Sequence, residues 1–112
     1  MTHTAQLPAI ISSYLTAHRD DDADTALAAF TDDATVIDEG HTYRGLGEID
    51  DWLHRSASEY TYTIEPTGTR RIDDDHWVAT HHLEGNFPGG VVDLNFAFTL
   101  RDGKIHHLVI AP

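Results

Sequence analysis

The spacing of apolar residues changes along the chain, from a helical period in the first half to strand alternation in the second. The segment Leu7–Arg19 is predicted to form a helix with Pro8 in its first turn. A second, shorter helix is predicted from an N-cap at Asp24 through about Phe30, and a third over Gly47–Ala57. The apolar stripe of the first helix repeats at helical intervals and consists of Leu7, Ile10, Ile11, Tyr14, Leu15 and His18.

Strand patterns occupy the rest of the chain. Thr35–Asp38 is predicted to be a short strand, because β-branched residues stand there between a turn and Gly40, and a polar loop is predicted from there through Gly45. Four longer strands are separated by turn residues and are predicted over Tyr60–Arg70, Trp77–Glu84, Val91–Leu100 and Lys104–Ala111. This order predicts a single α+β domain over residues 1–112, with helices on one side of a curved sheet.

The strand Val91–Leu100 shows which of its faces is buried. Apolar residues stand at every second position, and they are Val92, Leu94, Phe96, Phe98 and Leu100. Asp93 and Asn95 have the opposite parity and are expected on the outer face of the sheet. That outer face is mixed in character, which suits solvent or a subunit contact.

Composition and charge narrow the classes of partner. The 112 residues carry 19 acids and seven bases, a formal net charge of −12, which argues against binding to nucleic acid or to an anionic membrane. The chain has no cysteine, which excludes disulfides, thiolate metal sites and a cysteine nucleophile. No signal peptide or membrane span is recognisable, so a cytoplasmic location is expected. A domain this small buries a limited core, and a homodimer through the outer sheet face is expected.

Several short motifs resemble one known family over essentially the whole chain. They are Tyr14-Leu15, the stretch from Ala28 to Asp38, Tyr43-Arg44-Gly45 before the third helix, and Arg101 to Ile105 in the last hairpin. The chain resembles the nuclear transport factor 2-like superfamily, which includes SnoaL-like polyketide cyclases, ketosteroid isomerases, scytalone dehydratase and limonene epoxide hydrolase. The resemblance implies a cone-shaped barrel, in which the sheet wraps around the long first helix and leaves an internal apolar pocket. Because this fold serves several chemistries, the resemblance alone does not choose among them.

Asp38 and Tyr14 are the candidate catalytic residues. Asp38 stands two positions after Val36 and shares its face of the strand, so its carboxylate reaches the pocket if Val36 packs inward. A carboxylate in apolar surroundings is a usable general base, and the resemblance implies that role. Tyr14 lies in the middle of the helical stripe, and the resemblance implies that its hydroxyl donates to a developing oxyanion. The competing interpretations are an aspartate that binds loop N–H groups and an ordinary buried tyrosine.

The third group of the isomerase branch is not found at the expected parity. The resemblance implies a protonated aspartate on the penultimate strand, but Asp93 and Asn95 are expected to face outward. This departure puts steroid isomerase activity in doubt. A base and one phenol suffice for enolisation, aldol cyclisation or dehydration.

Nine histidines raise the question of a metal site. In His81-His82 and in His106-His107, one ring points inward and one outward. A strand separates the two pairs, so the rings stand about 9–10 Å apart, too far for one shared zinc ion. No metal and no cofactor are therefore expected, whereas an inward histidine suits a proton carrier. The expected substrate-binding residues are Trp52, Phe30, Phe96, Phe98, His81, His82 and His107.

The favoured function is an isomerase or cyclase acting on a small hydrophobic carbonyl compound, with Asp38 as base and Tyr14 as oxyanion donor. The alternative is a non-catalytic ligand-binding or assembly module on the same fold, because the catalytic set is incomplete. An epoxide hydrolase relay is less favoured, since Arg70 and Arg71 stand near the far end of their strand.

Overall fold

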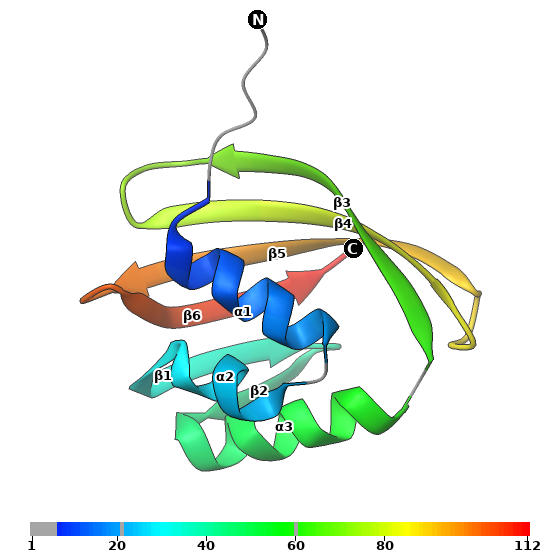
Figure 1. Ribbon diagram of the computed structural model, residues 1–112, viewed down its shortest axis with the longest axis horizontal. Coiled ribbons are helices and arrows are strands. Elements are labelled where there is room, and N and C mark those ends of the chain that lie inside the picture. The colour runs from blue at the N-terminus through cyan, green and yellow to red at the C-terminus, as the bar shows by residue number, and fades with distance from the viewer. Residues whose placement is uncertain (1–6, 21, 60) are drawn as a thin grey trace, which may run out of the picture.

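The computed structural model describes residues 7–20, 22–59 and 61–112. Three helices and six strands follow one another along the chain (Figure 1): α1 (Ala9–Arg19), α2 (Ala23–Ala28), β1 (Phe30–Asp38), β2 (His41–Arg44), α3 (Gly45–Glu59), β3 (Tyr62–Arg71), β4 (His76–Gly85), β5 (Val91–Arg101) and β6 (Lys104–Ala111). The α+β prediction is confirmed. The strand predicted over Tyr60–Arg70 begins with Tyr60, and this residue lies outside the described residues.

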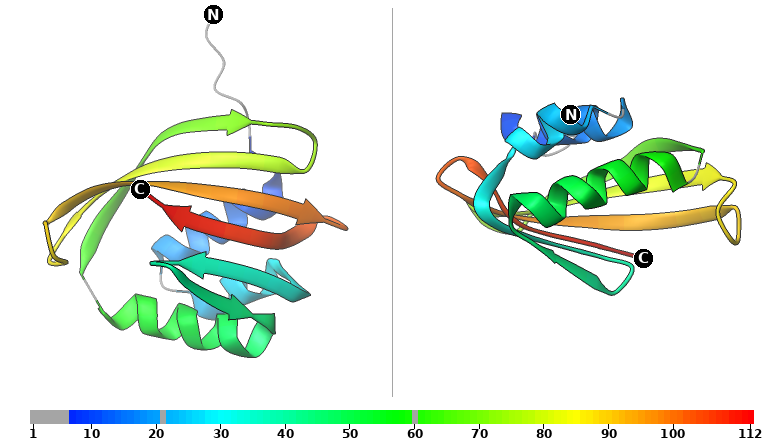
Figure 2. Two further views of the ribbon diagram at one scale, coloured as in Figure 1. Left: turned by 180° about the vertical axis from the view of Figure 1, so that it is seen from behind. Right: turned by 90° about the horizontal axis from the view of Figure 1, so that it is seen from below.

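The six strands form one mixed sheet in the order β2-β1-β6-β5-β4-β3. Neighbouring strands are antiparallel except β1 and β6, which run parallel, so the last strand of the chain lies beside the first. Figure 2 shows that the sheet is curved and that the helices cover one of its faces. The sheet stays open, with β2 and β3 as its two edges, so the predicted barrel is an unclosed cone.

The core lies between the helices and the concave face of the sheet. Helix α1 contributes Ile11 and Tyr14 of its apolar stripe, together with Ala17. From the sheet come alternating residues of each strand, and α3 adds Ile49, Trp52 and Leu53. The largest side chains that are almost completely buried are Tyr14, Phe30, Phe96, Phe98, Ile11, Ile49, Ile105, Leu108 and Val36. The hydrophobic interior is therefore rich in aromatic rings.

Two local predictions are wrong. The loop predicted before Gly45 contains the strand β2, which pairs with β1 through a tight turn at Glu39 and Gly40. Both turn residues have positive φ, as a two-residue hairpin requires, but the polar sequence of β2 hides its strand character. Helix α2 ends at Ala28, and Phe30 begins β1 instead of closing the helix. Strand β1 thus starts before Asp32 and Asp33, which are exposed where the β1–β6 register shifts.

The alternation predicted for β5 is confirmed. Phe96 and Phe98 are buried, whereas Asp93 and Asn95 are exposed on the other face. Asp93 pairs there with His82, and Asn95 accepts a hydrogen bond from Thr80. The inward side of β5 is consequently apolar. In the described parts of the chain, no helix is long and apolar enough to cross a membrane.

Candidate active site

Asp38 is the last residue of β1, and α3 holds its carboxylate. Val36, two residues earlier, is fully buried, and Asp38 shares its inward face. The indole Nε1 of Trp52 donates a hydrogen bond of 3.0 Å to Oδ2 of Asp38. The condition set by the sequence is met, because Val36 packs inward and the carboxylate follows it. Trp52 also fixes how that carboxylate is turned.

Tyr14 projects from α1 into the aromatic interior. Its ring is fully buried and stands edge-on to Phe30 and Phe98, at centroid distances of 5.4 and 5.8 Å. Its hydroxyl has no hydrogen-bond partner among the described residues. Burial, reinforced by the charges of Asp38 and Tyr62, raises the pKa of Tyr14 well above its usual value of 10.0. The phenol is therefore protonated at physiological pH and available as a donor.

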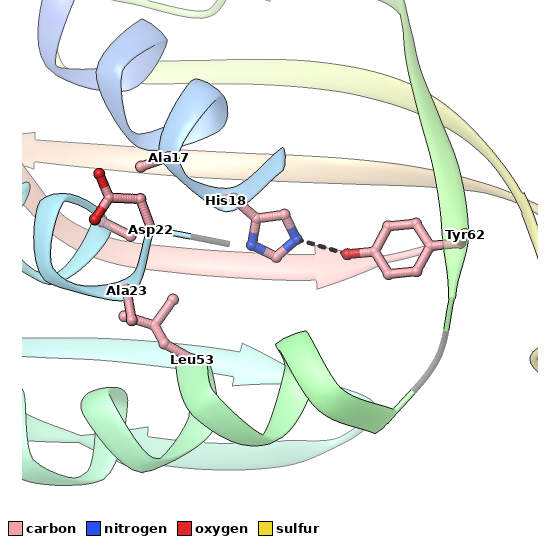
Figure 3. Close-up of a pocket in the computed structure, with 7 residues that line it drawn as sticks. Ala17, His18, Asp22, Ala23, Leu53 and Tyr62 are labelled. Carbon is pink, nitrogen blue, oxygen red and sulfur yellow. Dashed lines mark hydrogen bonds between the residues drawn. The ribbon is translucent and has the colours of Figure 1, made fainter. Parts of the chain in front are cut away.

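His18 and Tyr62 belong to the same region, although no motif or spacing in the sequence pairs them. His18 follows Tyr14 by one helical turn on α1, and Tyr62 begins β3. Figure 3 shows the two side chains pointing toward each other, and His18 Nε2 and the Tyr62 hydroxyl are 3.1 Å apart. The imidazole also stacks on Trp52 with ring centroids 6.3 Å apart. His18 thereby contacts the side chain that holds Asp38.

The predicted binding residues divide between the two faces of the sheet. Phe30, Phe96, Phe98 and Trp52 are all buried on the concave side. His81 lies there too, with its ring 4.8 Å from that of Phe96, and it is only 3% exposed. Burial lowers the pKa of His81, so its imidazole is neutral at neutral pH. Among the described residues its Nδ1 has no partner, and neither has Trp77 Nε1.

His82 and His107 lie on the opposite face from the aromatic interior. His82 bonds to Asp93 at 2.6 Å and to Glu84 at 3.1 Å, and these bonds raise the pKa of its imidazole. His107 is placed opposite Thr99 and Thr35, in the row of outward residues. His81 and His82 alternate between the faces, as neighbours in a strand do. At His106-His107 the register of β6 shifts, since Ile105 stands opposite Leu100 and His107 opposite Thr99, so the alternation expected for this pair does not hold. These two rings are therefore not part of the candidate site.

A cavity of about 20 Å³ opens beside His18, lined by Ala17, His18, Asp22, Ala23, Ala26, Leu53 and Tyr62. That volume holds about one water molecule. Figure 3 shows side chains of this lining, which come from the end of α1, from α2 with its N-cap, from the middle of α3 and from the start of β3. A ligand larger than water fits there only if these side chains move.

No group of three or more metal-binding side chains occurs within the described residues. Of the histidines that the sequence singled out, His82 bonds to two carboxylates on the outer face. His106 lies 3.2 Å from the Thr31 hydroxyl. The chemistry available in the site is thus that of one carboxylate, two phenols, imidazole rings and indole N–H groups.

Solved structures with the same fold include one relative of moderate sequence identity. A protein of Sinorhizobium meliloti, provisionally assigned as a polyketide cyclase, is 32% identical, with a TM-score of 0.89 over 98% of this chain and 100% of that one. A protein of Catenulispora acidiphila with a ketosteroid isomerase-like fold, in complex with trimethylamine, is 19% identical, with a TM-score of 0.82 over 96% and 87%. A second provisional polyketide cyclase, from Xanthomonas campestris, is 20% identical, with a TM-score of 0.77 over 90% and 85%.

The structural similarity agrees with a comparison of the sequence with protein families. No curated protein matches the chain. The SnoaL-like domain family, by contrast, matches residues 11–108, from the first turns of α1 into β6. The resemblance inferred from the motifs is confirmed, and the cone with its covering helices is the fold of these relatives. The chain belongs to the SnoaL-like domain family.

Proposed function

We propose that this protein is a cofactor-independent isomerase or cyclase of hydrophobic carbonyl compounds, with Asp38 as general base and Tyr14 as oxyanion donor. The observation that carries the proposal is the buried Tyr14 hydroxyl, which has no partner among the described residues and interacts electrostatically with Asp38. An unpaired buried donor costs about 1–3 kcal/mol, and a ligand oxygen would remove that cost. The provisional cyclase assignment of the Sinorhizobium relative supports this class of chemistry.

The reaction begins with proton transfer to Asp38. The carboxylate takes a proton from the carbon next to the ligand carbonyl, and the C–H electron pair becomes the C=C bond of an enolate. In an isomerisation, Asp38 returns the proton to another carbon of the ligand. In a cyclisation, the enolate carbon bonds to a second carbonyl carbon of the same molecule, and the oxygen of that carbonyl takes the proton. Trp52 orients the carboxylate through its hydrogen bond to Oδ2.

Tyr14 stabilises the negative charge that develops on the ligand oxygen. Its raised pKa keeps the hydroxyl protonated, so it donates a hydrogen bond and does not compete as an anion. A donor in a dry site stabilises a developing oxyanion more than it would in water. The inward side of β5 adds no acid to this donor, since Phe96 and Phe98 occupy it. One donor instead of two favours substrates whose proton is already acidified by a conjugated or second carbonyl.

The side chains proposed to contact the substrate are those that line the concave side: Trp52, Phe30, Phe96, Phe98 and His81. Their rings offer an apolar surface on which a flat molecule packs. His82 and His107 are left out because they lie on the outer face of the sheet. The outer face itself is proposed to join two copies of the chain in a homodimer.

A second candidate function is a ligand-binding module without catalysis. The small volume of the cavity beside His18 and the missing second acid favour it. Such a module would hold the same class of ligand, since Tyr14 and His81 still supply polar groups among aromatic rings. The two functions differ in whether a bound carbonyl compound loses its α-proton.

Exchange of that proton for deuterium tests the proposal directly. We expect the protein to accelerate exchange at the α-carbon of β-tetralone in D2O, followed by proton NMR. The Asp38→Asn variant is expected to lose at least about 100-fold in rate, the usual share of a positioned base. The matched control is Asp32→Asn, which removes an exposed carboxylate from the same strand and should leave the rate unchanged.

Three results separate the candidate functions. Loss of exchange in Asp38→Asn alone supports the enzyme. Binding of β-tetralone with exchange no faster than in buffer supports the non-catalytic module. Exchange by Asp38→Asn at the rate of the unmodified protein contradicts the role given to Asp38.

A further inference from the structure

The imidazole of His81 is a polar group in the hydrophobic interior to which the proposed reaction gives no step. It lies on the concave side of β4 with only 3% of the residue exposed, and its ring stands edge-on to that of Phe96, with centroids 4.8 Å apart. Among the described residues, its Nδ1 has no hydrogen-bond partner. An unpaired buried polar atom destabilises the native state, so a ligand atom that pairs with this nitrogen gains a bond without breaking an existing one.

Phe96 lies between His81 and the side of the sheet that carries Asp38. In the sheet register, Phe96 on β5 stands opposite Ile110 on β6, and Ile110 stands opposite Asp38 on β1. On its other side, β5 pairs with β4, the strand of His81. The apolar part of a ligand that packs on Phe96 therefore has Asp38 on the β1 side and His81 on the β4 side.

The strand beside His81 is irregular at this point. Pro66 of β3 stands opposite His81, and proline has no N–H group to donate to β4. The register of the two strands then shifts between Pro66 and Gly68. Such bulges are frequent at sheet edges and next to active sites, and β3 is an edge of this sheet. The sheet therefore yields beside His81 at a smaller cost in backbone hydrogen bonds than it would between two central strands.

The surroundings of His81 select a neutral ligand group that both donates and accepts hydrogen bonds. Burial lowers the pKa of His81, against a backbone hydrogen bond at Ala79 that raises it, so the imidazole is neutral at neutral pH. A neutral ring gives no counter-charge to a carboxylate or an ammonium group, and an unpaired charge is costly to bury. A hydroxyl pairs with Nδ1 in either tautomer of the ring, whereas a carbonyl oxygen pairs only with a protonated Nδ1.

We propose that His81 is a specificity-determining residue, whose Nδ1 bonds to a neutral hydroxyl group of the ligand. This inference rests on the proposed function and narrows its substrate class to hydrophobic carbonyl compounds that also carry a hydroxyl. The carbonyl lies toward Asp38, the apolar part packs on Phe96, and the hydroxyl lies toward β4. A compound without the hydroxyl leaves Nδ1 unpaired, as it is in the free protein, and so binds less tightly by the contribution of one hydrogen bond.

Phenol and toluene test the hydroxyl with two probes of equal size, since toluene has a methyl group where phenol has the hydroxyl. Dissociation constants are measured with the full chain by NMR titration, and the readout is the ratio of the toluene constant to the phenol constant. We expect His81→Phe, which keeps a ring and removes the nitrogen, to lower this ratio about tenfold. The matched control is His82→Gln, which changes the next residue, on the outer face, and should leave the ratio unchanged.

Nitrogen-15 spectra of the imidazole report on the bond itself. The Nδ1 signal of His81, assigned by its absence in His81→Phe, should shift when phenol is added and stay in place when toluene is added. A purely structural role of His81 would change the free energy of unfolding of the variant, but neither the ratio nor the response of the Nδ1 signal.

The outcomes for this inference and for the proposed function are distinct. The inference is overturned by an equal ratio in the unmodified protein and His81→Phe, by a ratio that also falls in His82→Gln, or by no binding of phenol at concentrations that leave the protein folded. A lowered ratio in His81→Phe together with unchanged deuterium exchange in Asp38→Asn supports the role of His81 and contradicts that of Asp38. The reverse pair of results supports Asp38 and overturns His81. Circular dichroism checks that each variant is folded, and His81→Leu repeats the test if His81→Phe is not.

Discussion

At the scale of single residues, the buried hydroxyl of Tyr14 stands out, because an unpaired buried donor lowers the free energy of unfolding. It is held in an apolar setting by rings on two sides and has no partner among the described residues. A structural tyrosine in a core usually finds a partner for its oxygen, because the desolvation of the hydroxyl is otherwise uncompensated. Tyr14 departs from this rule. Its ring packs in the core and stabilises the fold, whereas its hydroxyl is proposed to bind a ligand.

Replacement of Tyr14 by Phe is expected to affect stability and activity in opposite directions. The ring stays and the unpaired oxygen goes, so the free energy of unfolding should be unchanged or rise by up to about 1 kcal/mol. The exchange rate should fall. Urea denaturation and the tetralone assay measure the two effects. A loss of stability greater than about 1 kcal/mol would show that the hydroxyl has a structural partner.

The same variant has a pH signature. In the native protein the pKa of Tyr14 is raised above 10.0, so above that pH the unfolded chain loses a proton that the native chain retains. The native state is then disfavoured as pH rises, because the unfolded state ionises more readily. The difference in stability between Tyr14→Phe and the unmodified protein should therefore grow above pH 10 in favour of the variant.

The sequence predicted some of these residues and missed others for definable reasons. The parity of Val36 and Asp38 follows from strand geometry, so the inward carboxylate could be foreseen. His18 was visible only as a member of an apolar stripe. Its bond to Tyr62 joins residues 44 positions apart, and nothing local in either segment indicates that contact. The hydrogen bond from Trp52 to Asp38 likewise depends on how α3 packs against β1.

At the scale of elements, the start of β3 is held closely against the end of β4. Gly85 stands opposite Tyr62 in the register of the two strands. A Cβ at Gly85 would lie 2.5 Å from the Cβ of Tyr62 and would also strike the backbone oxygen of Thr61. Asn86 also holds the two strands together, because its side-chain Oδ1 accepts a hydrogen bond of 2.8 Å from Thr61 N. Because Gly85 has no side chain, the backbone of β3 at Tyr62 can lie this close to β4.

Gly85→Ala is expected to destabilise the protein by about 2 kcal/mol, because the added methyl group meets backbone atoms that cannot move aside easily. Gly68→Ala is the matched control. It lies at the register shift of β3, where an added Cβ meets nothing within 4 Å, and its effect should stay below about 1 kcal/mol. Chemical denaturation of both variants provides the comparison. Equal stabilities would contradict the close approach of the two strands at Gly85.

Element prediction worked where a pattern was local. Alternation in β4, β5 and β6 gave their positions to within one or two residues, because one side of each strand packs on the core. The strand β2 has four mostly exposed residues at the sheet edge, so no buried face imposes a pattern on it. The parallel pairing of β1 with β6 joins distant segments, and short-range signals do not encode it.

At the scale of the whole molecule, the net charge and the outer face of the sheet have opposite effects on the association of two copies. Each chain carries a formal charge of −12, which repels a second copy. The outer face offers an apolar row across four neighbouring strands, formed by Val78, Ala97, Val109 and Ile37, which stand opposite one another in the sheet register. Burial of such a row favours association, while the charge sets its dependence on salt.

We expect the chain to sediment with the mass of two copies, and more completely at higher salt, because screening weakens the repulsion. Ala97→Arg places a charge in the middle of the apolar row and should give single chains. Ser13→Arg makes the same change in charge on an exposed position of α1 and should leave the mass unchanged. Single chains for the unmodified protein at all salt concentrations would contradict the homodimer. Analytical ultracentrifugation measures all three.

The place of β6 in the sheet has a consequence for how the molecule is made. It lies between β1 and β5, so the two halves of the sheet touch only through the strand that a ribosome delivers after the others. Until Lys104–Ala111 has left the exit tunnel, β2 is the only strand available to pair with β1 in the sheet order, and the other edge of β1 has no strand beside it. The six-stranded sheet of this domain is therefore completed only after β6 has been synthesised. Until then, the many negative charges of the nascent chain oppose its aggregation with other chains.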